Sequence, residues 1–110
     1  MSIETLINDW RKCIDENAQA KSDAEYLREF RKSKKAILMQ EAQSKGIKTG
    51  QERESYAYAH DEYIELLEGL RVAVEKAESF RCRMILAEKR VNIWQTKQAS
   101  ARKEQGMYGA

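Results

Sequence analysis

The chain has 110 residues, no proline and five glycines, and 35% of its residues are charged. Proline and glycine are the residues that most weaken a helix interior, so this composition predicts one all-α domain built from long helices. Its mean hydropathy is −0.78, and no stretch approaches the ~18 apolar residues that a membrane-spanning helix needs. We therefore expect no membrane span.

The first residues and the number of cysteines indicate the cellular compartment in which we expect the protein. The first turns carry Glu4 and Asp9 and lack the basic region of a signal peptide. Two cysteines, Cys13 and Cys82, are too few for a secreted disulfide scaffold. We expect a cytoplasmic protein.

Residues 1–45 predict a first long helix. Ile3, Leu6, Trp10 and Cys13 keep heptad spacing, after which the apolar phase drifts. The phase resumes with a second group of apolar residues, Tyr26, Phe30, Ile37 and Leu38. Two interpretations follow: one long helix with a phase shift, or a break near 17–22 where Ser22 and Glu25 form a capping box.

Residues 46–60 predict a loop with a short helix. Gly46 and Gly50 are the clearest loop signal in the chain. We expect Thr49 to cap a short helix from Gln51 to Ala59, and Asp61 to cap the long helix that follows.

Residues 61–105 predict a second long helix with a regular heptad seam, followed by a flexible tail at 106–110. Eleven of the twelve seam positions are apolar or aromatic, which is typical of a coiled coil. The first set of positions is Tyr63, Leu70, Ala77, Met84, Val91 and Gln98, and the second set is Leu66, Ala73, Phe80, Ala87, Trp94 and Ala101.

Alternating charge blocks predict how the two long helices meet. Residues 1–27 carry six acids and three bases (net −3), and residues 28–48 carry two acids and seven bases (net +5). Residues 49–80 carry eight acids and three bases (net −5), and residues 81–110 carry two acids and seven bases (net +5). An antiparallel hairpin places opposite charges side by side. With its turn near 46–60, facing residue numbers add up to about 106, which sets Trp10 near Trp94.

Apolar residues outside the seam predict a further packing surface. A two-helix hairpin buries one stripe on each helix. Six isoleucines and leucines then need cover, and we expect a homodimer that forms a four-helix bundle. These residues are Ile7, Ile14, Ile64, Ile85, Leu86 and Ile93.

The first candidate nucleic-acid site is a basic cluster with aromatic neighbours Tyr26 and Phe30. Such residues can hold phosphates and stack on bases. The cluster consists of Arg28, Arg31, Lys32, Lys34 and Lys35. The alternative is that these bases pair across the hairpin with Glu65, Glu68, Glu75 and Glu78.

The second candidate site lies near the end of the chain. Arg83, Arg90 and Lys97 flank the heptad seam one heptad apart. They could line a basic groove for nucleic acid, or they could set coiled-coil partner choice. The wider set of bases is Arg81, Arg83, Lys89, Arg90, Lys97, Arg102 and Lys103.

No motif indicates catalysis, and we expect neither an enzyme, a cofactor nor a metal. His60 is the single histidine, and its place at a helix start favours a capping or surface role. Zinc-type spacing and a glycine-rich phosphate loop are both missing from the sequence. Cys13 aligns with the apolar stripe and Cys82 with the outer face.

Residues 49–104 resemble small all-helical proteins of tailed bacteriophages. The resemblance is carried by residues 62–73, by Ala87 and Glu88, and by residues 91–96. Proteins of this kind are encoded near phage recombination and single-strand annealing genes. The resemblance implies an accessory role in DNA metabolism in the host cytoplasm, with single-stranded DNA or a recombination protein as partner.

Three functions remain open at this point. The chain could be a phage-type accessory protein that contacts DNA or a recombination protein. It could be a protein-binding module that inhibits a host enzyme. It could also be a structural coiled-coil oligomer.

Overall fold

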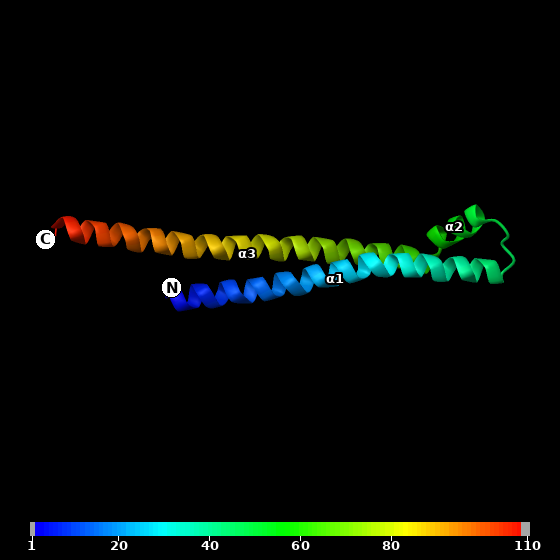
Figure 1. The fold of residues 1–110 in the computed structure, drawn as a ribbon, viewed down its shortest axis with the longest axis horizontal. Coiled ribbons are helices and arrows are strands. Elements are labelled where there is room, and N and C mark those ends of the chain that lie inside the picture. The colour runs from blue at the N-terminus through cyan, green and yellow to red at the C-terminus, as the bar shows by residue number, and fades with distance from the viewer. Residues whose placement is uncertain (1, 109–110) are drawn as a thin grey trace. The chain divides into compact units, whose positions relative to one another are not determined.

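Three helices make up the fold in the computed structural model, which describes the backbone of residues 2–108 and the side chains of residues 2–106. They are α1 (Ile3–Ser44), α2 (Gly50–Ala59) and α3 (Asp61–Tyr108) (Figure 1). No strand occurs in the described backbone. The predicted all-α fold with two long antiparallel helices is confirmed.

The ends of the long helices differ slightly from the expected ones. α3 continues to Tyr108 rather than ending at residue 105, because a single glycine such as Gly106 weakens a helix without ending it. Residues 109 and 110 of the expected tail lie outside the described residues.

α1 is continuous through residues 17–22, so the structure has the single long helix of the two interpretations. Across residues 19–23, the Gln19 side-chain amide donates to Asp23 Oδ1 at 2.9 Å, one helical turn further along. The expected capping box of Ser22 and Glu25 does not form, because the helix does not begin there.

The apolar phase of α1 corrects our prediction. Side chains that are buried or half-buried recur at alternating spacings of three and four from Ile3 to Glu41, without a shift. Tyr26, Phe30 and Ile37 lie outside this seam and are 67%, 37% and 53% exposed. The sequence was misleading because two bases, Arg31 and Lys34, occupy seam positions.

The seam of α3 agrees with the predicted heptad. All ten seam residues from Tyr63 to Trp94 are buried or half-buried, and every other described α3 side chain is exposed. The last two seam positions, Gln98 and Ala101, are exposed.

The turn is fixed by backbone geometry at the end of α1. Gly46 has a φ of 90°, a conformation that favours glycine. The Gly46 and Ile47 amides donate to the carbonyls of Gln43 and Ala42 at 3.0 and 3.1 Å. The Arg53 side chain also donates to the Ile47 carbonyl at 2.8 Å, which fastens the loop to α2.

Side chains cap both following helices. Thr49 Oγ1 accepts from the Glu52 amide at 3.1 Å, as expected for the N-cap of α2. At the start of α3 the cap is His60, not Asp61, because α3 begins one residue earlier than a cap at Asp61 requires. His60 Nδ1 accepts from the Glu62 amide at 3.1 Å.

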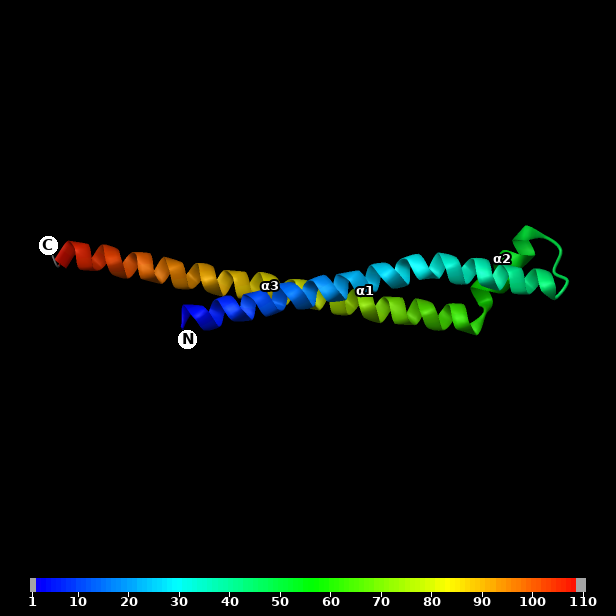
Figure 2. The ribbon, with the colours of Figure 1, turned by 60° about the horizontal axis from the view of Figure 1, so that its bottom comes forward.

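The chain forms two compact units. The turn unit comprises Gln19–Ala77, and the terminal unit comprises Met1–Ala18 with Glu78–Ala110. In the turn unit Leu38, Ala57 and Tyr63 form a buried cluster, so α2 covers the last turns of α1 (Figures 1 and 2).

The terminal unit pairs the start of α1 with the second half of α3. Leu6, Ala87 and Val91 are its most buried apolar side chains, at 8%, 6% and 4% exposure. In this unit α3 runs on beyond the first residues of α1 (Figures 1 and 2).

The register within each unit differs from the expected one. Leu38 packs with Tyr63 in the turn unit, and Leu6 and Trp94 line one hollow in the terminal unit. Facing residue numbers thus add up to 100 or 101, not 106. The reason is that α2, rather than α3, lies opposite the last turns of α1.

Candidate interaction surfaces

Two lysines of the first basic cluster lie against carboxylates of other helices. Lys34 Nζ is 2.6 Å from Glu62 Oε2 of α3, and Lys35 Nζ is 2.8 Å from Glu54 Oε1 of α2. Lys34 and Lys35 are 21% and 31% exposed. These ion pairs lie within the turn unit and join α1 to the two helices that follow it.

The same contacts shift the ionisation of the partners. The hydrogen bond from Lys35 holds the pKa of Glu54 below its ordinary value, and the hydrogen bond from Lys34 does the same to the pKa of Glu62. The hydrogen bond to Glu54 raises the pKa of Lys35.

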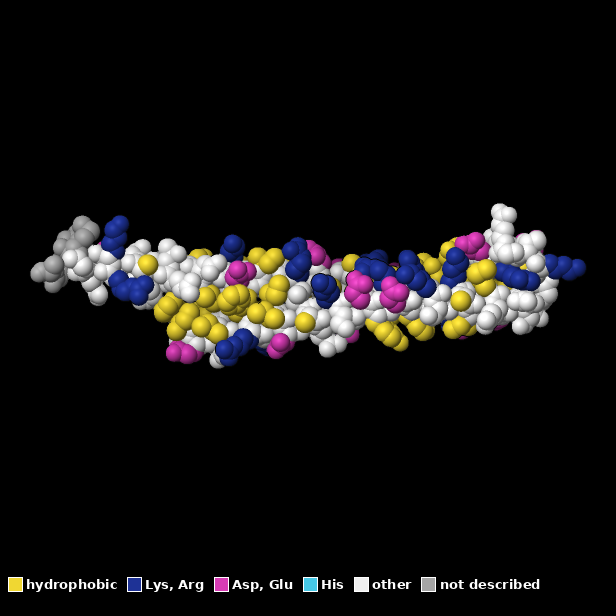
Figure 3. All heavy atoms as spheres, in the orientation of Figure 1, with side chains coloured by type: hydrophobic (Ala, Val, Ile, Leu, Met, Phe, Trp, Pro, Cys, Tyr) yellow, Lys and Arg dark blue, Asp and Glu magenta, His cyan; other side chains and the backbone are white. Residues whose placement is uncertain are grey.

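Other bases of the first cluster pair within α1. Arg28 bonds to Glu25, and Lys32 Nζ is 3.3 Å from Glu29 Oε2. Arg31 is half-buried on the α1 seam. Figure 3 shows basic and acidic side chains interspersed over the middle of α1.

Most of the bases in this cluster therefore have acidic partners, but not the partners we expected. Glu68 and Glu75 instead contact Arg71, and Glu78 contacts Arg81, all within α3. We expected these glutamates of α3 to face the first cluster because the predicted register differs from the observed one by about six residues.

The second cluster has a different environment. Arg83, Arg90 and Lys97 are exposed and recur every seven residues, about 10.5 Å apart along α3. Arg83 lies over the Phe80 ring at 5.0 Å. Among the side chains of residues 2–106, none of the three has a carboxylate within ion-pair distance.

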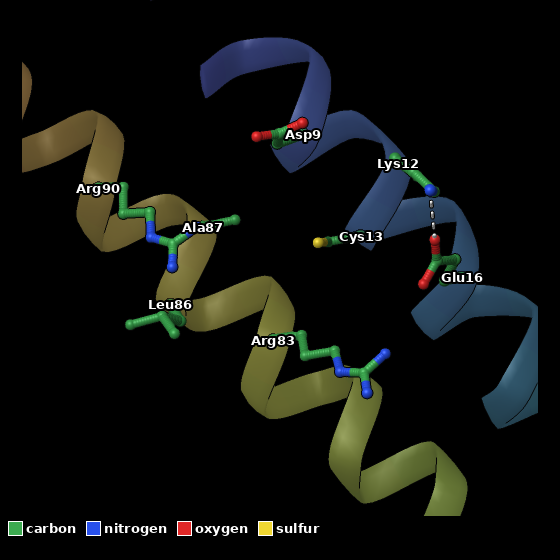
Figure 4. Close-up of a pocket in the computed structure, with 8 residues that line it drawn as sticks. All are labelled: Asp9, Lys12, Cys13, Glu16, Arg83, Leu86, Ala87 and Arg90. Atoms are coloured by element: carbon green, nitrogen blue, oxygen red, sulfur yellow. Dashed lines mark ion pairs between the residues drawn. The ribbon is translucent and has the colours of Figure 1, made fainter. Parts of the chain in front are cut away.

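A hollow of about 300 Å³ lies between α1 and α3 in the terminal unit (Figure 4). Cys13 and Ala87 point toward each other across it, and Arg83 and Arg90 lie on its α3 side. The hollow is lined by Asp9, Lys12, Cys13, Glu16, Arg83, Leu86, Ala87 and Arg90. Its α1 side therefore offers two carboxylates and its α3 side two guanidinium groups.

Those opposite charges do not meet within the chain. The ion pair drawn in Figure 4 joins Lys12 to Glu16 at 3.8 Å, within α1. A second hollow of about 310 Å³ follows along the same side of α3, lined by Leu6, Arg90, Ile93, Trp94 and Lys97.

The end of α3 forms a basic arm, which we define as residues 95–106. Every arm side chain is exposed, including the seam residues Gln98 and Ala101. The arm carries three bases, Lys97, Arg102 and Lys103, and one acid, Glu104. No ion pair to these bases occurs among the described side chains.

Apolar side chains are exposed in both units. In the turn unit, the rings of Tyr26 and Phe30 stack with centroids 6.0 Å apart and an 11° angle, and Ile37 follows on α1. In the terminal unit, Leu86 and Ile93 are 54% and 55% exposed. Figure 3 also shows hydrophobic side chains gathered over the first part of α1 and the adjoining part of α3.

The remaining candidate residues have structural surroundings. His60 caps α3 through Nδ1, and its Nε2 lies 3.7 Å from Glu41. Cys13 is half-buried and Cys82 is exposed. In the described part of the chain, no three histidine, cysteine or acidic side chains gather as a metal site would require.

Sequence reasoning named the bases of the arm but predicted neither its exposure nor the hollow. The hollow arises because Cys13 and Ala87 are small residues at facing seam positions, which only the correct register brings together. The arm follows from the lengths of the two helices relative to that register. Its sequence signal was Gln98, the single polar residue in the predicted seam.

The chain is an all-helical hairpin, and comparison with protein families, with curated proteins and with solved structures finds no match. None of the described helices combines the length and the apolar character that crossing a membrane requires.

Proposed function

We propose that this protein is a non-enzymatic accessory protein of DNA metabolism in the host cytoplasm, and that it contacts single-stranded DNA through the basic arm of α3. The observation that carries this proposal is the difference between the two basic regions. Most bases of the first cluster are held by carboxylates, whereas Lys97, Arg102 and Lys103 have no such partner in the described structure. Bases without acidic partners are free to replace the counterions of phosphates.

The exposure of the arm supports the same proposal. Every arm side chain is exposed, and the spacing of Lys97, Arg102 and Lys103 places these bases on different sides of α3. A basic surface of this kind can follow the phosphate backbone of a single strand without base-specific contacts. Gln95, Gln98 and Ser100 add uncharged hydrogen-bonding groups between the bases.

Fluorescence anisotropy with labelled oligothymidine tests this function. Replacing Lys97, Arg102 and Lys103 with alanine should weaken binding about tenfold or more at about 50 mM salt. If all three bases contact phosphates, the variant should also reduce the salt dependence by about two in the log–log slope, because each contact on a single strand contributes about 0.7.

A matched control removes the same number of charges from bases that already have partners. Arg28, Lys32 and Lys45 each pair with a glutamate within α1. Replacing these three with alanine should change the affinity less than about twofold, because the neighbouring glutamates already neutralise these bases and weaken their attraction to phosphates. Equal losses in the two variants would contradict the assignment to the arm.

A protein-binding role is the second candidate, favoured by the stacked pair Tyr26 and Phe30 together with Ile37. Contiguous exposed apolar side chains mark protein contacts. The partner would be a recombination protein or an inhibited host enzyme. A single host protein that is recovered with the wild-type chain, and is lost with Tyr26→Ser and Phe30→Ser, would support this role without any DNA.

A purely structural coiled-coil role makes a separate prediction. It requires an oligomer that grows with concentration and binds no nucleic acid. Sedimentation over a wide concentration range distinguishes it from the other two functions.

A further inference from the structure

We propose that a second copy of this chain docks on the face of the terminal unit that contains the hollow, and that the two copies point in the same direction. The occupant is identified by the charges on that face. It carries acids on one helix and bases on the other, and the two sets are not paired with each other inside one chain. This proposal concerns self-association and does not depend on DNA binding.

The positions of the charges select the second copy as partner. Asp9 and Glu16 lie on α1, and Arg83 and Arg90 lie on α3, all lining one hollow (Figure 4). In the register of this unit, Asp9 is level with Arg90 and Glu16 is level with Arg83. A face with acids along one edge and bases along the other is complementary to itself.

The same charges select the relative direction of the copies. A two-fold axis parallel to the helices places α1 of one copy over α3 of the other at the same level. Arg90 then meets Asp9 of the second copy, and Arg83 meets its Glu16. An axis perpendicular to the helices would instead set bases against bases and acids against acids, which is unfavourable.

Apolar side chains supply the centre of this contact. Leu86 and Ile93 are more than half exposed and lie along the same side of α3 as the two hollows. In the parallel arrangement Leu86 of the second copy lies over the hollow floored by Cys13 and Ala87. Small residues facing a neighbour's leucine are a common basis of helix packing, and burying these side chains favours association.

Lys12 is the one base on the acidic edge. It lies 3.8 Å from Glu16 and is 78% exposed, so its side chain is able to turn toward solvent when an arginine approaches Glu16. Asp9 has no ion partner among the described side chains and is the stronger acceptor for the second copy.

The arrangement has a consequence for the arms. Because the two copies point in the same direction, both basic arms project from the same end of the dimer. Two arms side by side would hold one strand at two points, which increases the effective concentration of the second contact.

Sedimentation velocity of charge-exchanged variants tests the interface. One variant carries Arg83→Glu and Arg90→Glu, so the four positions that meet the second copy (9, 16, 83 and 90) are all acidic. The other carries Asp9→Lys and Glu16→Lys, so its face is wholly basic. The wild-type chain should sediment at twice its mass of 12.8 kDa, and each variant alone should dimerise at least about tenfold more weakly.

An equimolar mixture of the two variants should form a heterodimer, because the acidic face of one then meets the basic face of the other. A matched control exchanges charges on the outer faces of the same helices, Asp15→Lys in one chain and Lys89→Glu in the other. Both control chains should dimerise like the wild type, alone and mixed.

Folding of the variants is checked by circular dichroism, and Leu86→Glu provides a second probe that leaves every seam residue intact. It should abolish the dimer while helicity is unchanged. Three outcomes would overturn the proposal: a wild-type chain that is monomeric at micromolar concentration, variants that dimerise normally on their own, or a mixture that fails to associate although both variants are folded.

Discussion

At the scale of single residues, the position of each base of the first cluster in the heptad repeat determines which acidic partner it contacts. Lys34 and Arg31 fall on the α1 seam, and Lys35 is one position further around the helix. These bases lie beside the helices that follow, and two of them meet Glu62 and Glu54. Arg28 and Lys32 point outward and pair along their own helix instead.

The two contacts between helices predict a loss of stability in acid. The pKa values of Glu54 and Glu62 lie below the ordinary value of 4.5 in the folded chain. The unfolded chain therefore binds protons first as the pH falls. Stability from these pairs is fully present above pH ~5 and is lost as the pH falls through the depressed pKa values.

Glu54→Gln together with Glu62→Gln should lower the melting temperature at neutral pH and flatten its decrease below pH ~5. Thermal unfolding followed by circular dichroism from neutral to acidic pH measures both effects. Asp15→Asn is the control, since Asp15 is exposed on the outer face of α1. An unchanged acid profile in the double variant would contradict the role given to these pairs.

At the scale of elements, glycines act differently at the end of α1 and inside α3. Gly46 adopts a φ of 90° where α1 stops. Gly69, by contrast, lies inside α3, and beyond the adjoining backbone of its own helix nothing lies within 4 Å of where a Cβ would sit. Glycine is therefore required by the backbone conformation at position 46, whereas at position 69 the helix could accept a larger residue.

Gly46→Ala should destabilise the hairpin by about 1 kcal/mol or more, because alanine is strained at positive φ. Gly69→Ala should stabilise it by about 0.5–1 kcal/mol, because alanine favours the helix and meets no obstacle. Chemical denaturation of both variants gives the two free energies of unfolding. Effects of the same sign would contradict the structure of the turn or of α3.

The basic arm should be the least protected part of α3 when no ligand is present. A short helix without a packed face is only marginally stable in water. Hydrogen exchange should therefore be fast over residues 98–106 and slow near Val91, where α3 packs on α1. Equal protection of the two stretches would show that the arm is already covered.

At the scale of the whole molecule, the sequence predicted the elements better than it predicted their register. The α3 heptad was correct from Tyr63 to Trp94 because its seam is almost wholly apolar. On α1, Arg31 and Lys34 occupy the seam while Tyr26 and Phe30 lie outside it, so a reading based on apolar residues chose the wrong face.

The candidate surfaces depended on that register. The sequence identified the bases, but not which of them would meet carboxylates, because α2 displaces α3 from the end of α1. The hollow depends on the register that packs Leu38 with Tyr63 and sets Leu6 beside Trp94, and this register could not be predicted from the sequence.

Disulfide trapping tests the register most directly, since both proposed surfaces rest on Cys13 lying opposite residue 87. In a chain with Cys82→Ser, adding Ala87→Cys should give rapid cross-linking within one molecule on mild oxidation, whereas adding Ile93→Cys should give little. Non-reducing electrophoresis of dilute samples separates the cross-linked monomer. A preference for position 93 would restore the register with facing numbers near 106 and contradict the account.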